Sequence, residues 1–229
     1  MNSDTVKGIT GYKPKDISLY ENAFTHKSLV KETGVKSNER LEFIGDSVIN
    51  MIVAEYLYET FPDENEGFLT KIRTKIVCSK GLSTLASKMN LHEYIQMNAK
   101  AMSHNWNTNQ RILEDAFESL VGALYLDRGL ECCRKFMRKL INTHFNNECL
   151  TVDTNYKEIL MKYTQKKNMP VPQYIITHEN GPDHNKFFTV QITINNKKIS
   201  EGTDKSKKNA EQNAANLALN CLGYTQLNV

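Results

Sequence analysis

The sequence predicts an all-α domain followed by a small α+β domain of helix, three strands and helix (α-β-β-β-α). From about residue 17 to residue 145, apolar residues recur at spacings of three and four, and alternating β-branched runs are missing. After a short polar segment, the pattern changes to two helix-like runs that enclose three strand-like runs. We therefore expect the first domain at residues 1–148, a linker at 149–154 and the second domain at 155–229.

The composition is that of a globular protein. The 229 residues suffice for two domains of ordinary size, and 40% of them are hydrophobic and 24% charged. No run approaches the roughly 18 consecutive apolar residues of a membrane span, and the first residues lack the apolar core of a secretion signal. The five cysteines form no Cys-x-x-Cys pair, so neither a zinc site nor a disulfide framework is expected. We expect an intracellular, cytoplasmic protein without a membrane segment.

Acidic residues interrupt one of the strongly apolar helices. Glu39, Glu42 and Asp46 lie at positions i, i+3 and i+7, so they share one stripe of a helix. Their neighbours, such as Leu41 and Val48, are apolar. Burial and mutual repulsion would raise the pKa values of these carboxylates, and a cation between them would remove that cost.

A second helix carries a second acidic pair, Asp115 and Glu118, again among apolar and small residues. Two such helices can build an all-oxygen site, which hard divalent ions such as Mg²⁺ prefer. In metal-assisted phosphodiester hydrolysis, the ion activates a water molecule and neutralises charge on the phosphate. Carboxylates at these spacings are also common on solvated helix faces, so spacing alone leaves both interpretations open.

The last third of the chain has its own charge and element pattern. Residues 153–229 carry ten basic and seven acidic residues, whereas residues 1–152 carry 19 of each. We expect helices at 156–167 and from about 205 to 221, and strands at 173–178, 187–195 and 198–202. Gly181-Pro182 and Asn195-Asn196 supply the turns between strands. The basic excess marks this part as the place to look for a phosphate-contacting surface.

Residues 38–49, NERLEFIGDSVI, resemble the ribonuclease III signature almost letter for letter. Three further blocks agree with that family in the expected order, at residues 23–28 (AFTHKS), 66–73 (EGFLTKIR) and 112–129. Arg128 departs from a frequent glycine. The resemblance covers about residues 17–145.

This resemblance implies a metal site and an activity. The four carboxylates of the family's metal site are matched by Glu42, Asp46, Asp115 and Glu118. The ion is expected to be Mg²⁺, with Mn²⁺ as a substitute. Glu39 and Glu66 match acidic residues near the subunit interface and the edge of the cleavage site, and for these a structural and a functional role both stay open. Family members are homodimers that cleave double-stranded RNA to 5′-phosphate and 3′-hydroxyl ends with short 3′ overhangs.

Residues from about 155 to 222 resemble a double-stranded-RNA-binding domain. The helix face that touches the RNA minor groove in that family is matched by Glu158, Met161, Lys162 and Gln165. Met161 stands where relatives often carry glutamine. His184 matches a residue that reaches the next minor groove. The start of the last helix, whose dipole favours phosphate, carries Lys205, Lys207 and Lys208. Three lysines in a run are also common on solvated surfaces.

Together the resemblances imply a dimeric, Mg²⁺-dependent endoribonuclease whose partners are double-stranded RNA and a second copy of the chain. One alternative is a protein of the same fold that binds duplex RNA without cutting it. Another is an RNA chaperone or ribosome-associated factor, which would also bind without turnover. The presence of all four carboxylates favours the enzyme.

Overall fold

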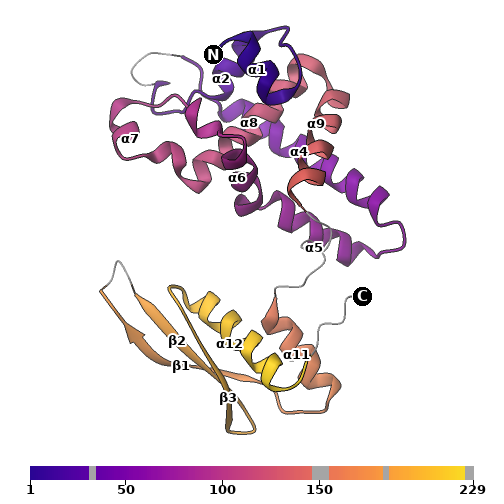
Figure 1. Cartoon of the computed structure of the whole chain (residues 1–229), viewed down its shortest axis with the longest axis vertical. Helices are drawn as coiled ribbons and strands as arrows, with labels where there is room; N and C mark the ends of the chain where they lie inside the picture. The colour runs from indigo at the N-terminus through magenta and orange to yellow at the C-terminus, as the bar shows by residue number, and fades with distance from the viewer. Residues whose placement is uncertain (31–34, 146–154, 183–185, 225–229) are drawn as a thin grey trace. The chain divides into compact units, whose positions relative to one another are not determined.

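The computed structural model describes residues 1–30, 35–145, 155–182 and 186–224 (Figure 1). Its contacts divide the chain into two compact units, Met1–Leu150 and Thr151–Val229, and each is described by itself. The linker expected at 149–154 lies outside the described residues, so its boundaries stay a prediction.

The first unit is helical, as predicted. Its α-helices are α1 (Ser3–Thr10), α2 (Ile17–Ala23), α4 (Glu39–Thr60), α5 (Glu66–Val77), α6 (Ser79–Lys88), α7 (Ala99–Ser103), α8 (Gln110–Arg128) and α9 (Leu130–His144). A short 3₁₀ turn precedes α7 at Leu91–Glu93, and another follows it at Trp106–Thr108. The sequence did not lead us to expect α1, which is short. Asn2 caps its start by accepting a hydrogen bond from the Thr5 amide at 2.8 Å.

Two glycines let the long helices α4 and α8 approach each other closely. A Cβ at Gly45 of α4 would lie 1.9 Å from the carbonyl oxygen of Glu118, and a Cβ at Gly122 of α8 would lie 2.1 Å from that of Leu41. Neither distance is compatible with any side chain. This packing sets the distance between the acidic stripes of the two helices.

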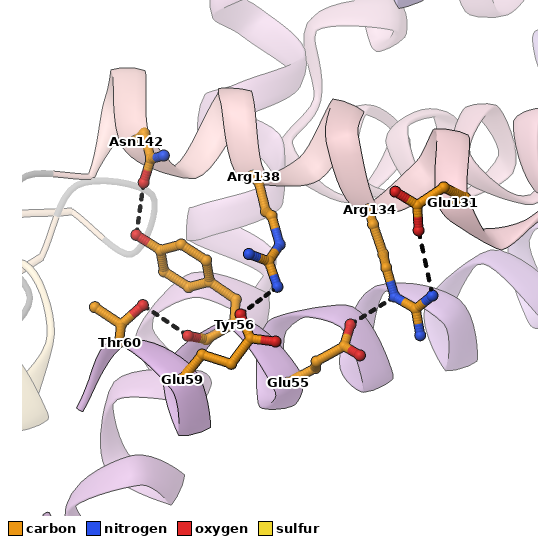
Figure 2. A network of polar contacts seen from close by, with 8 residues as sticks. All are labelled: Glu55, Tyr56, Glu59, Thr60, Glu131, Arg134, Arg138 and Asn142. Atoms are coloured by element: carbon orange, nitrogen blue, oxygen red, sulfur yellow. Dashed lines mark hydrogen bonds and ion pairs between the residues drawn. The ribbon is translucent and has the colours of Figure 1, made fainter. Parts of the chain in front are cut away.

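The C-terminal half of α4 is joined to α9 by polar contacts, which Figure 2 shows. Three of them run between the helices: Arg134 Nε with Glu55 Oε2 at 2.7 Å, Arg138 Nη2 with Glu59 Oε2 at 2.5 Å, and the Tyr56 hydroxyl donating to Asn142 Oδ1 at 2.6 Å. Opposite charges therefore meet at this end of α4.

A buried carboxylate near the end of α8 holds the segment that precedes α2. Asp127 accepts hydrogen bonds from the backbone amides of Lys15 at 3.0 Å and Asp16 at 2.8 Å, and from the Tyr20 hydroxyl at 3.0 Å. Asp127 thus has a structural role and lies outside the acidic stripes.

The second unit has the predicted helix, three strands and helix. They are α11 (Tyr156–Lys166), β1 (Gln173–Asn180), β2 (Phe187–Ile194), β3 (Lys197–Asp204) and α12 (Lys207–Cys221). The strands form an antiparallel sheet in the order β1-β2-β3. Helix α12 packs on β2 and β3, and α11 packs beside α12. Asn195 and Asn196 have φ values of 53° and 57°, which gives the tight turn expected between β2 and β3.

The ends of three elements differ from the prediction, namely those of the two outer strands and of the last helix. The outer strands are longer than expected, because pairing with β2 continues to Asn180 on β1 and to Asp204 on β3. The last helix begins at Lys207, not near Lys205, because the Ser206 hydroxyl accepts a hydrogen bond from the Asn209 amide at 3.1 Å and so forms the N-cap. Lys205 therefore lies before the helix. No helix among the described residues is long and apolar enough to cross a bilayer.

Candidate metal centre and nucleic-acid interface

Three carboxylates from two helices converge in the first unit. One oxygen from each of Glu42, Asp115 and Glu118 lies within 4.8 Å of the other two. Glu42 comes from the first turn of α4, and the other two come from successive turns of α8. Only 8% of Glu118 is exposed, whereas Glu42 and Asp115 are half-buried. The donor atoms are all oxygens, which fits a hard divalent cation.

The charge of this cluster is poorly compensated by the protein itself. Burial, and then the charges of Asp46 and Glu114, raise the pKa of Glu118 from 4.5 to about 8. Burial and the charge of Asp115 raise the pKa of Glu42. Burial and the charge of Glu114 raise the pKa of Asp115. A bound divalent cation would relieve this repulsion, so the electrostatics also fit a metal site.

Asp46 lies beside this cluster and is not one of its three members. It is exposed, and its Oδ1 accepts a hydrogen bond from Asn50 Nδ2 at 2.7 Å, one turn further along α4. Its charge is nevertheless the first of those that raise the pKa of Glu118. The structure therefore brings together three of the four predicted ligands and leaves the fourth next to them.

The two other predicted acidic residues are outside the cluster. Glu39 accepts a hydrogen bond from the Ser37 hydroxyl at 2.9 Å, and it lies 3.8 Å from the Lys27 ammonium. Glu66, in the first turn of α5, accepts a hydrogen bond from the Thr70 hydroxyl at 2.8 Å. It lines a pocket of about 480 Å³ between α4 and α5.

Three charged residues at the cluster were not singled out from the sequence. Glu114 raises the pKa of Asp115 and of Glu118, the two cluster carboxylates of α8, and Arg111 and Lys27 lower the pKa of Asp115. Helical spacing could have indicated Glu114 and Arg111, because each lies four residues before a cluster carboxylate. Only the tertiary structure brings Lys27 to the site.

The predicted RNA-facing surface of α11 is accessible. Glu158, Lys162 and Gln165 are exposed and Met161 is half-buried. Lys162 Nζ lies 2.6 Å from Glu158 Oε1, so this pair is already engaged on the helix surface. Together with Tyr174 at the start of β1, these residues line a shallow pocket of about 500 Å³.

The lysines around the start of α12 are accessible but not equivalent. Lys205 lies 5.7 Å from the centre of the Phe187 ring, and Lys208 is exposed. Lys207 Nζ is 2.9 Å from Glu179 Oε1 on β1, so this cation has an acidic partner within the unit. His184, the other predicted contact, lies outside the described residues.

Both units match known families. Residues 16–144 match the family described as Ribonuclease-III-like, and residues 156–222 match the Double-stranded RNA binding motif.

Whole-chain relatives come from a virus and from bacteria. A protein of Paramecium bursaria Chlorella virus 1 is 43% identical over 223 residues, which are 97% of this chain and 80% of that protein. Ribonuclease 3 of Listeria monocytogenes is 37% identical over 217 residues, 93% of this chain and 95% of the relative. The solved nuclease domain of ribonuclease III from Campylobacter jejuni is similar with a TM-score of 0.59 and 34% identity, and the match covers 63% of this chain and 99% of that domain.

Proposed function

The chain belongs to the ribonuclease III family and is an endoribonuclease, and from this premise we propose that it cleaves double-stranded RNA in a divalent-metal-dependent reaction. The observation that carries the proposal is the convergence of Glu42, Asp115 and Glu118 from two helices. A solvated acidic surface would not bury Glu118 to 8% exposure beside two other carboxylates.

We assign Glu42, Asp115 and Glu118 as metal ligands, and Asp46 as the fourth carboxylate of the centre. Mg²⁺ is the proposed ion, because the donors are hard oxygens, and Mn²⁺ should substitute. Such an ion, when bound, activates water and neutralises charge on the scissile phosphate. The protein's own part is to hold the carboxylates in place, which the close contact of α4 with α8 supports.

We further propose that the second unit recognises the shape of duplex RNA. The exposed face of α11 would contact a minor groove, and the lysines around the start of α12 would contact phosphates. Domains of this kind span roughly 16 base pairs with little sequence preference. Duplex binding should therefore weaken as salt rises.

A second copy of the chain is the proposed protein partner. Phe43, Met51 and Tyr58 share one face of α4 and are 78%, 46% and 74% exposed. Large apolar side chains in such a row favour burial against another surface. The Campylobacter jejuni nuclease domain is described as having a region involved in dimer formation. In a homodimer each subunit would cut one strand, which leaves 5′-phosphate and 3′-hydroxyl ends with short 3′ overhangs.

The deciding experiment compares the wild-type chain with Glu118→Gln on a long RNA duplex, in Mg²⁺ and in EDTA. We expect cleavage by the wild type in Mg²⁺ only, and duplex binding without cleavage by Glu118→Gln. Glu93→Gln, which removes an exposed carboxylate outside the cluster, is the matched control and should cleave normally. Sequencing of the product ends tests the overhang.

Tight binding by the wild type without cleavage in either Mg²⁺ or Mn²⁺ would instead leave a duplex-RNA-binding protein on a nuclease scaffold. The intracellular location expected from the sequence stays a prediction, which fractionation of the source cells would test.

A further inference from the structure

Two cations border the carboxylate cluster. Lys27 follows α2, and its ammonium lies 3.8 Å from Glu39, with 67% of the side chain exposed. Arg111 is exposed in the first turn of α8, one turn before Asp115. Glu39, the ion-pair partner of Lys27, lies three residues before Glu42 in the first turn of α4. Arg111 lies four residues before Asp115, so it shares a face of α8 with that carboxylate. Both cations are exposed, and they therefore lie at the solvent side of the cluster.

The backbone that carries Lys27 is held firmly in place. The preceding residue, His26, donates its amide to the Gln96 carbonyl at 2.9 Å. The following residue, Ser28, accepts a hydrogen bond from the Asn98 amide at 3.1 Å. The Asn38 amide at the start of α4 donates to the Thr25 carbonyl at 3.0 Å. Lys27 is thus anchored to the same helix that supplies Glu42.

A cation at this place would offset the negative charge that an entering RNA strand meets at the cluster. Residues 1–152 carry 19 basic and 19 acidic residues, so the net charge of the unit does not attract a polyanion. The acidic cluster by itself repels RNA. A strand that enters the site therefore needs local positive charge, and Lys and Arg are the side chains that bind phosphate oxygens.

We propose that Lys27 and Arg111 bind backbone phosphates of the RNA strand in the cleavage site and so position it over the carboxylates. This inference rests on the proposed function. The competing explanation is that both cations only neutralise carboxylates of the protein itself. The two explanations differ in what happens to RNA binding when the cations are removed.

The test measures duplex binding by the full chain in the Glu118→Gln background with Mg²⁺, from about 50 to 200 mM salt. The variants are Lys27→Gln, Arg111→Gln and both together, with Lys27→Arg and Arg111→Lys as charge-preserving substitutions. Lys7→Gln, on α1, is the matched control, because it removes an exposed lysine from a helix that contributes nothing to the cluster.

We expect each charge-removing substitution to weaken binding several-fold at low salt and to lower the slope of log affinity against log salt by about 0.9. The charge-preserving variants and Lys7→Gln should keep the wild-type slope. An unchanged slope in the double variant, with tighter Mg²⁺ binding, would overturn the phosphate contacts and leave neutralisation as the role of both cations. A wild-type chain that binds duplex but never cleaves it would overturn the proposed function, which is a separate outcome.

Discussion

The two ends of α4 meet their partner helices in opposite ways. Towards its N-terminus, α4 places Glu42 against carboxylates of α8, where like charges raise one another's pKa. Towards its C-terminus, the same helix places Glu55 and Glu59 against arginines of α9 (Figure 2). One contact is electrostatically unfavourable without a ligand, and the other is satisfied within the protein. The difference supports the proposal that the first end binds a cation, whereas the contacts at the second end hold the fold.

The largest effect that we expect is a difference in cleavage rate between matched substitutions at the two ends of α4. Glu42→Gln removes a proposed metal ligand, so cleavage should fall on the order of 10³-fold, as loss of several kcal/mol of charge stabilisation implies. Glu55→Gln should leave the cleavage rate within about twofold, because it removes only an ion pair to α9. Single-turnover cleavage of one duplex by both variants checks this. Equal losses in the two variants would contradict the division of α4 into a functional and a structural end.

A substitution that forces α4 away from α8 should destabilise the fold near the N-terminal end of α4 by disturbing the packing of the two helices. Gly45→Ala adds a Cβ that would lie 1.9 Å from a backbone oxygen of α8, so unfolding free energy should fall by about 3 kcal/mol. Gly8→Ala is the control, because nothing lies within 4 Å of its added Cβ and alanine is the better helix former. Denaturant unfolding of both variants tests the close approach. A Gly45→Ala chain as stable as the wild type would mean that the helices can move apart freely.

The pH dependence of metal binding sharpens the comparison further. A metal ligand must be deprotonated, and the pKa of Glu118 is raised to about 8, so Mg²⁺ affinity should rise with pH by up to about tenfold per unit below that value. Without metal, the pH dependence of folding stability has the opposite sign, because stability falls as pH rises. The folded state favours the protonated carboxyl, so its stabilising contribution is present below pH 4.5 and is lost as pH rises through about 8.

Glu118→Gln removes this titration, so the metal-free variant should lose less stability than the wild type between about pH 5 and pH 8. Calorimetric Mg²⁺ titration and thermal unfolding in EDTA measure the two quantities. Parallel stability curves for the two proteins would show that Glu118 is not destabilised in the folded state.

The smallest expected effect concerns the second end of α4. The ion pair between Glu55 and Arg134 is about one-third exposed on both sides. Its loss in Glu55→Gln should lower the Tm by a few degrees at low salt and by less at high salt, because ions screen exposed pairs. Thermal unfolding at two salt concentrations checks this. A loss that does not depend on salt would point to packing instead of charge as the contribution of Glu55.

Periodicity and motif spacing were sufficient to predict the helical unit, the order of elements in the second unit and the carboxylates on two helices. They predicted the turn at Asn195-Asn196 because asparagine readily adopts positive φ. They did not reveal α1, which has only eight residues. They also placed the start of the last helix about two residues too early. Ser206 is the capping residue, and it stands within a run of lysines that gives no signal of where the helix begins.

Helical spacing predicted which site residues share a face of one helix, but not which residues of other elements lie next to them. Spacing places Glu42 and Asp46 on one stripe, but it does not show that Asp46 accepts a hydrogen bond from Asn50 and lies outside the group of three converging carboxylates. Lys27 is a further example, because it reaches the site through contacts with residues about 70 positions away in sequence. Such tertiary neighbours leave no periodic signal in a single sequence.

The hydrogen bonds to Asp127 have a consequence for folding kinetics. The amides of Lys15 and Asp16 belong to a segment outside any helix, yet their acceptor lies more than 110 positions along the chain. They can be protected from exchange with solvent deuterium only after the end of α8 has docked. Their exchange rates should therefore follow opening of the whole nuclease unit, and we expect the same of the central α8 amides. The exchange of these two amides would therefore report on the long-range step in which the N-terminal segment docks onto the helical core.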